Sequence, residues 1–99
     1  MSDADVIEID AKSKIGKPVV VIFDGRVLEV FGVKDDATWR VPARMIEVRD
    51  KGADRKGNLA LQLHPDILGH NCDVFFSPDQ ADECRRLVDA LVAGGATRV

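Results

Sequence analysis

A single amphipathic helix at the C-terminal end of the chain constrains the fold most. Positions 78–93 place one apolar stripe on the helix, which is the spacing of a helix that buries one face. The stripe consists of Ala81, Cys84, Leu87, Val88, Leu91 and Val92. The apolar runs before it are β-branched or alternate with polar residues, so they predict strands. One helix after a series of strands predicts an antiparallel sheet or barrel that the helix covers.

The two ends of this helix are also marked. Ser77 and Gln80 have the spacing of a capping box, and Pro78 stands at the first helical position, where no amide donor is needed. Gly94 and Gly95 follow the last apolar position and predict the helix end.

The clearest hairpin is predicted at positions 19–31. Asp24-Gly25 between two β-branched runs is typical of a two-residue turn, which would pair Phe23 with Arg26 and Val21 with Leu28. In that pairing both faces of the hairpin are largely apolar. The outer face would present a candidate interface made of Val20, Ile22, Val27 and Phe31.

The other strands follow the same logic and give six to seven in all. They are expected at 39–41, 45–49, 58–64 and 72–76, and Val6–Ile9 can form an edge strand. Loops are expected at 32–38, 51–57 and 65–71, the last with room for one helical turn. The whole chain is expected to form one domain, with flexible ends at 1–5 and 95–99.

Composition narrows the class of function. The 99 residues are 45% hydrophobic and 31% charged, with a formal net charge of −3. This composition indicates a globular protein whose overall field repels nucleic acid and anionic lipid, so that binding either would need a local basic patch. We therefore expect no nucleic-acid partner. No apolar run reaches the roughly 20 residues of a membrane span, and residues 1–5 do not resemble a signal peptide, so the expected location is cytoplasmic.

Two basic clusters are candidates for anion binding. Lys12, Lys14 and Lys17 precede the first hairpin, where they could hold an anionic group or simply form a solvated connector beside upstream acids. The second cluster is interleaved with two aspartates, which favours a solvated hairpin tip. It consists of Arg49, Lys51, Arg55 and Lys56.

Catalytic and metal chemistry find little support. His64, His70 and Cys72 carry metal-binding atoms, but they are scattered along the chain without the paired spacing of a zinc site. Cys84 fits the buried stripe of the helix better than a fourth ligand position. We expect no metal, no cofactor, no disulfide and no enzymatic activity.

The ordered pieces resemble the pleckstrin-homology-like superfold as found in small bacterial domains, including GRAM-like ones. The matching segments cover about four fifths of the chain by pattern. They are 19–31, 39–48 with its Pro42 kink, 58–63, and 74–76 leading into 77–92. The superfold usually has seven strands, whereas six are readily visible here. The resemblance implies a split, two-sheet antiparallel barrel of six to seven strands, with the helix (about 78–93) closing one end.

Fold resemblance alone does not choose a function. Relatives bind phosphoinositides through a basic first loop, bind proteins, or assemble. The two-sided apolar hairpin favours a module for protein binding or self-association. The alternative is binding of anionic lipid headgroups through the basic loop 12–17.

Overall fold

The computed structural model describes residues 6–34, 37–67 and 70–99. Within these residues, eight strands and one α-helix follow one another, with two short 3-10 helices. The strands are β1 (Ile7–Lys12), β2 (Pro18–Phe23), β3 (Val27–Lys34), β4 (Ala37–Pro42), β5 (Glu47–Ala53), β6 (Leu59–Ile67), β7 (His70–Phe76) and β8 (Thr97–Arg98). The helices are η2 (Ala43–Met45), η3 (Pro78–Gln80) and α1 (Ala81–Ala93).

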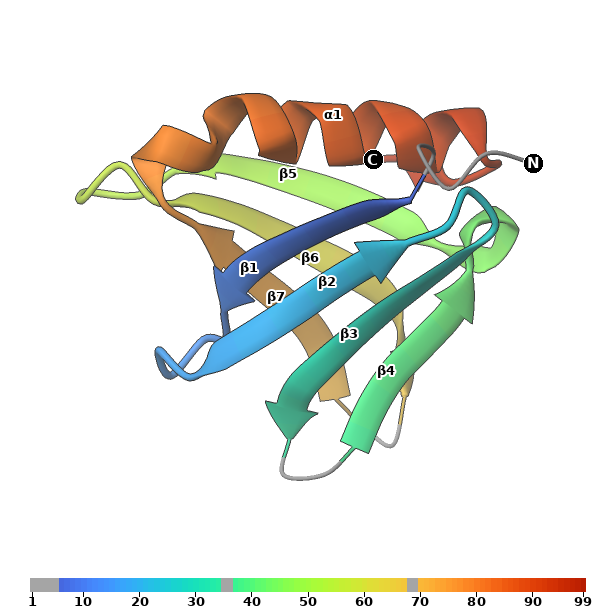
Figure 1. The fold of residues 1–99 in the computed structure, drawn as a ribbon, viewed down its shortest axis with the longest axis horizontal. Helices are drawn as coiled ribbons and strands as arrows, with labels where there is room; N and C mark the ends of the chain where they lie inside the picture. Colours follow the sequence, from blue (N-terminus) through green and yellow to red (C-terminus); the bar gives the residue numbers. More distant parts are fainter. Residues whose placement is uncertain (1–5, 35–36, 68–69) are drawn as a thin grey trace.

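All eight strands belong to one sheet that bends into two layers. The strand order is β4-β3-β2-β1-β7-β6-β5-β8. Figure 1 shows β1–β4 as a front layer, β5–β7 behind it, and α1 lying across one end of both layers. The predicted mainly β architecture with one C-terminal helix is confirmed. The predicted barrel is wrong in that it does not close: β4 and β8 end the sheet, and Pro42 at the end of β4 lacks the amide that would extend a ladder.

The strand count exceeds the predicted six to seven because of β8. After α1 the chain turns back, buries Ala96 and pairs Thr97 and Arg98 in parallel with Glu47 and Val48 of β5. A two-residue strand has no periodicity of its own, so nothing in the sequence marks it. It lies within the C-terminal stretch expected to be flexible; residues 1–5 fall outside the described part of the chain.

Strands also extend into segments predicted as loops. β1 is not an edge strand, since it lies between β2 and β7. β3 runs to Lys34 through an irregularity at Gly32, whose φ is +90° and where a Cβ would approach Pro18 O to 3.1 Å. β5 reaches Ala53, and β6 and β7 occupy most of 65–71. These strands continue because neighbouring strands provide backbone hydrogen-bond partners. The local sequence of these segments has no strand pattern that would predict this pairing.

The predicted pairing of the first hairpin is wrong by two residues. Phe23 pairs with Leu28 and Val21 with Val30. Asp24 causes the longer turn, because its Oδ1 accepts hydrogen bonds from the amides of Arg26 and Val27, both at 2.8 Å. A shift of two residues leaves every side chain on its original face, so the predicted inner and outer faces hold.

The inner faces of the two layers and one face of α1 form a single core. The helix contributes Cys84, Leu87, Val88 and Leu91, four of the six predicted stripe residues. The prediction is wrong for Val92, which is 42% exposed at the edge of the stripe, and Ala81 is only partly buried. The predicted capping box at its start is present, with Gln80 Oε1 accepting a hydrogen bond from the Ser77 amide at 2.9 Å. Gln80 Nε2 also donates to the carbonyl of Asp10 at 2.6 Å. This contact ties the start of the helical segment to β1.

Candidate functional site

Two loops far apart in the sequence meet around one hollow of about 500 Å³, which we call the basic hollow. The loop between β1 and β2 forms one wall, and the tip of the β5–β6 hairpin forms the other. The lining residues are Lys12, Ser13, Lys14, Gly16, Asp54, Arg55, Lys56, Asn58 and Phe75. The loops come together because β1 meets β7 at the pair Lys12–Phe75, while β7 also pairs with β6.

Each wall of the basic hollow is held by its own hydrogen bonds. In the β1–β2 loop the buried Ser13 donates its amide to Lys17 O at 2.8 Å and accepts at Oγ from the Lys17 amide at 3.1 Å. In the β5–β6 tip, Asp54 Oδ1 accepts from the amides of Lys56 and Asn58 at 2.8 and 2.9 Å. The loops therefore present their basic side chains from defined turns.

The charge of the basic hollow is strongly one-sided. Lys12, Lys14, Arg55 and Lys56 carry four positive charges, against one carboxylate from Asp54. That carboxylate already accepts two backbone hydrogen bonds. A concave site with four cations concentrates positive potential on a molecule whose formal net charge is −3.

The structure separates the three predicted lysines. Lys12 and Lys14 line the basic hollow, whereas Lys17 is exposed and is not part of its lining. Ile15 lies between Lys14 and Lys17 in the sequence and is 82% exposed. The loop that carries the lysines therefore also presents a solvent-exposed apolar side chain.

Sequence reasoning missed the contribution of Arg55 and Lys56. It placed them in a separate cluster neutralised by neighbouring aspartates, whereas the structure brings them beside Lys12 and Lys14, so that four cations share the hollow with the one carboxylate of Asp54. The other members of that cluster, Arg49 and Lys51, are exposed on β5 and do not line the hollow. The only signal available beforehand was the shared polarity of two loops, and their proximity depends on a long-range strand pair.

A second hollow of about 700 Å³ continues from the first. The two share Lys12, Asn58 and Phe75. Pro18 and Gln80 line its far part. The basic end thus opens onto a less charged groove along the junction of β1 and β7.

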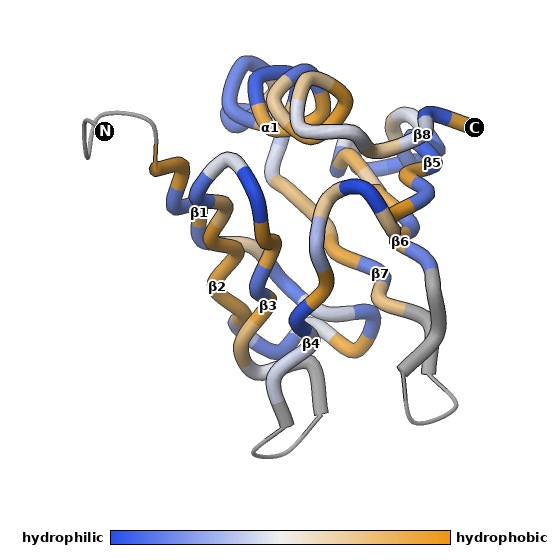
Figure 2. The backbone as a smooth tube through the Cα atoms, turned by 90° about the vertical axis from the view of Figure 1, so that its right-hand side faces the viewer, coloured by the Kyte–Doolittle hydropathy of each residue, from blue (hydrophilic) through white to orange (hydrophobic). Residues whose placement is uncertain are grey.

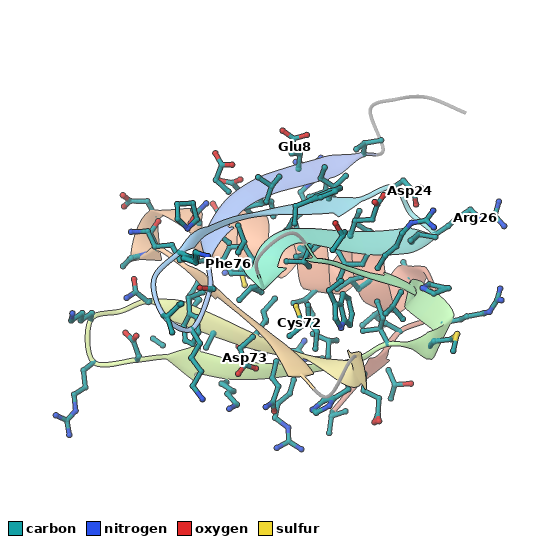
Figure 3. The ribbon with its side chains drawn as sticks, turned by 90° about the horizontal axis from the view of Figure 1, so that it is seen from below. Glu8, Asp24, Arg26, Cys72, Asp73 and Phe76 are labelled. Atoms are coloured by element: carbon teal, nitrogen blue, oxygen red, sulfur yellow. The ribbon has the colours of Figure 1, made fainter. Side chains whose placement is uncertain are left out.

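The predicted interface lies on the outer face of the β1–β4 layer, and we call it the outer apolar face. Val20, Ile22 and Val27 are half-buried, and Phe31 is 39% exposed. Figure 2 shows β2 as apolar along almost its whole length, which fits a strand with apolar side chains on both faces. Figure 3 shows Glu8 pointing away from the core beside this face, while Cys72 points inward.

The cysteines and histidines do not form a site in the described part of the molecule. Cys72 and Cys84 are both buried free thiols. Burial raises the pKa of Cys72 to about 12 and that of Cys84 to about 11, so both stay protonated at neutral pH. Within residues 6–34, 37–67 and 70–99, no three metal-binding side chains come together; the side chain of His70 lies outside the described set.

Comparisons with known proteins give no relative. No protein-family model matches the chain, no curated protein matches it, and no solved structure matches it. Among the described residues, no helix has the length and apolar character needed to cross a bilayer. The pleckstrin-homology-like resemblance therefore stays a prediction.

Proposed function

We propose that this chain is a non-enzymatic, pleckstrin-homology-like module that binds anionic lipid headgroups at the basic hollow. The observation that carries the proposal is the meeting of two basic loops around one concavity, with Lys12 and Lys14 on one side and Arg55 and Lys56 on the other. The pleckstrin-homology-like assignment is supported by seven antiparallel strands, β1–β7, followed by a covering helix.

The four cations suit a phosphate-bearing group. Lysine ammonium groups act as point charges, and the guanidinium of Arg55 can make two parallel hydrogen bonds to phosphate oxygens. Each basic side chain near an anionic membrane surface contributes about 1 kcal/mol. Four such residues therefore contribute about 4 kcal/mol to binding an anionic membrane surface. This contribution weakens as the salt concentration rises.

Ile15 favours a membrane over a dissolved anion as the source of the phosphate. A side chain 82% exposed at the tip of the lysine loop gains by entering the headgroup region of a bilayer. A free anion offers Ile15 no apolar contact. In this proposal the protein acts in the cytoplasm, where the facing leaflet is rich in anionic lipid.

Vesicle co-sedimentation tests the proposal. We expect binding to vesicles of phosphatidylcholine with added phosphatidylserine, little binding to phosphatidylcholine alone, and weaker binding as salt rises. The double variants Lys12→Gln/Lys14→Gln and Arg55→Gln/Lys56→Gln should each lose roughly tenfold or more in affinity.

Lys17 and Ile15 supply matched controls. Lys17→Gln removes the same charge from the same loop but outside the hollow, so we expect it to retain most of the binding. Ile15→Ser should weaken binding to vesicles while leaving the amide-shift response to inorganic phosphate unchanged. Equal binding to neutral and acidic vesicles would contradict the proposal, as would equal losses for Lys17→Gln and the two double variants. A response to inorganic phosphate without vesicle binding would assign the hollow to a dissolved anion.

A further inference from the structure

The outer apolar face has an acidic side on β1 and a basic residue on β4. Strand pairing orders its residues into rows that cross the layer from β1 to β4. One row is Glu8, Ile22, Glu29 and Arg40, and the next is Asp10, Val20, Phe31 and Thr38. Ile22, Val20 and Phe31 thus occupy the middle of a surface whose two sides differ in charge, together with Glu29, whose carboxylate pairs with Arg40 of the same chain.

The core of the folded chain does not require the apolar residues at the centre of the outer apolar face. The opposite side chains of β2 and β3, including Val21 and Val30, already fill the core at 0% exposure. In the second layer the corresponding outward row holds Arg49, Gln62 and Asp73. A stable layer of this sheet is therefore compatible with polar outward residues, and the apolar ones need another reason.

We infer that two copies of the chain pack against each other through the outer apolar face. A two-fold axis parallel to the strands, between β2 and β3, lays β4 of one copy over β1 of the other and keeps each row over itself. Arg40 then faces Glu8 of the second copy, and Phe31 faces Val20 of the second copy. Glu8 and Arg40 are then complementary in charge, and Val20 and Phe31 in apolar character, as an isologous interface requires. Ile22 faces Glu29 of the second copy, whose carboxylate keeps Arg40 of its own chain as its partner.

The state of Arg40 fits this arrangement. Its Nε lies 3.7 Å from Glu29 Oε2 of the same chain, yet 65% of its side chain stays exposed. Stacking a second sheet at about 10 Å brings another carboxylate to that exposed portion. A purely basic or purely acidic partner would match only one side of the face, whereas a second copy matches both.

Sedimentation analysis of single and mixed charge-reversal variants tests this interface. We expect the wild-type chain to dimerise reversibly. Arg40→Glu alone places Glu opposite Glu8 twice, and Glu8→Arg alone places Arg opposite Arg40 twice, so each should dimerise at least about tenfold more weakly. In an equimolar mixture both contacts of the heterodimer are again between opposite charges. The mixture should recover dimers that neither variant forms alone.

Two further variants complete the experiment. Phe31→Asp should abolish dimerisation, whereas Met45→Asp, at a residue 59% exposed in η2, should not change it. A wild-type chain that stays monomeric at about 1 mM, where a Kd of that size already half-fills an interface, would overturn the inference. So would dimers that survive Phe31→Asp, or a mixture no more dimeric than its components. None of these variants touches the basic hollow, so the inference and the lipid proposal fail separately.

Discussion

The two hairpins β2–β3 and β5–β6 are built alike on the inside and differently on the outside. Both bury their inward residues, such as Phe23 and Leu61, at 1% and 0% exposure. Both also begin their turn with an aspartate that accepts two backbone amides, Asp24 in one and Asp54 in the other. The outward residues of β2–β3 are largely apolar, whereas β5–β6 presents charge and a basic tip. The need to form a core therefore determines the inward-facing residues of each hairpin. The outward-facing residues are free to differ, and they determine what each hairpin can bind.

The largest expected effect separates the two faces of the first hairpin. Phe23→Ala should lower the free energy of unfolding by about 3–5 kcal/mol, because it empties a fully buried position. Phe31→Ala, at a residue 39% exposed, should cost less than about 1 kcal/mol. Urea denaturation of both variants measures the difference. Comparable losses would show that Phe31 belongs to the folding core, which would remove the case for an interface.

Much of this inside–outside division could be predicted from the sequence. Alternation in β6 identified Leu61 and Leu63, and the stripe of α1 identified Leu87 and Leu91; all four are at 0% exposure. These patterns are local, and side-chain direction repeats every two residues in a strand and every 3.6 in a helix. The faces of the first hairpin also survived an error in its pairing, since the error was an even number of residues.

The candidate site was harder to predict, because long-range geometry decides it. The basic hollow exists because Lys12 pairs with Phe75 across two distant strands, and no local pattern reports that pairing. Nor does the sequence show that Arg55 and Lys56 join Lys12 and Lys14 around one hollow, where the four cations outnumber the carboxylate of Asp54. The sequence identified both loops as basic, but it did not predict that they lie next to each other in the fold.

An intermediate effect is expected from the two turn aspartates. Asp24→Ala and Asp54→Ala each leave two amides without a side-chain acceptor, and each should cost about 1 kcal/mol. Hydrogen bonds from the amides of Val27 and Arg26 hold the pKa of Asp24 below its ordinary value of 3.8. Its stabilising contribution is therefore fully present above pH 3.8 and is lost as the pH falls further, through the folded-state pKa.

The pH dependence gives this prediction its control. The stability gap between the wild-type chain and Asp24→Ala, measured by denaturation, should be constant from pH 7 to pH 5 and should shrink near pH 3. A gap that widens at low pH would have the wrong sign for a carboxylate stabilised in its ionised form. A negligible gap at pH 7 would show that the turn does not depend on its aspartate.

The smallest stability effect is expected where the two layers carry exposed ion pairs. Arg40 pairs with Glu29 at 3.7 Å on the first layer, and Arg98 pairs with Asp50 at 3.8 Å beside the second. The two arginine side chains are 65% and 58% exposed, so replacing either with Ala should change the free energy of unfolding by no more than about 0.5 kcal/mol.

The two variants should differ in association: Arg40→Ala weakens the dimer, and Arg98→Ala leaves it unchanged. If both variants weakened dimerisation equally, net charge would explain the association and the outer apolar face would not. If Arg40→Ala instead destabilised the monomer by several times that amount, Arg40 would serve the fold of the first layer, and its position opposite Glu8 in the inferred dimer would carry no weight.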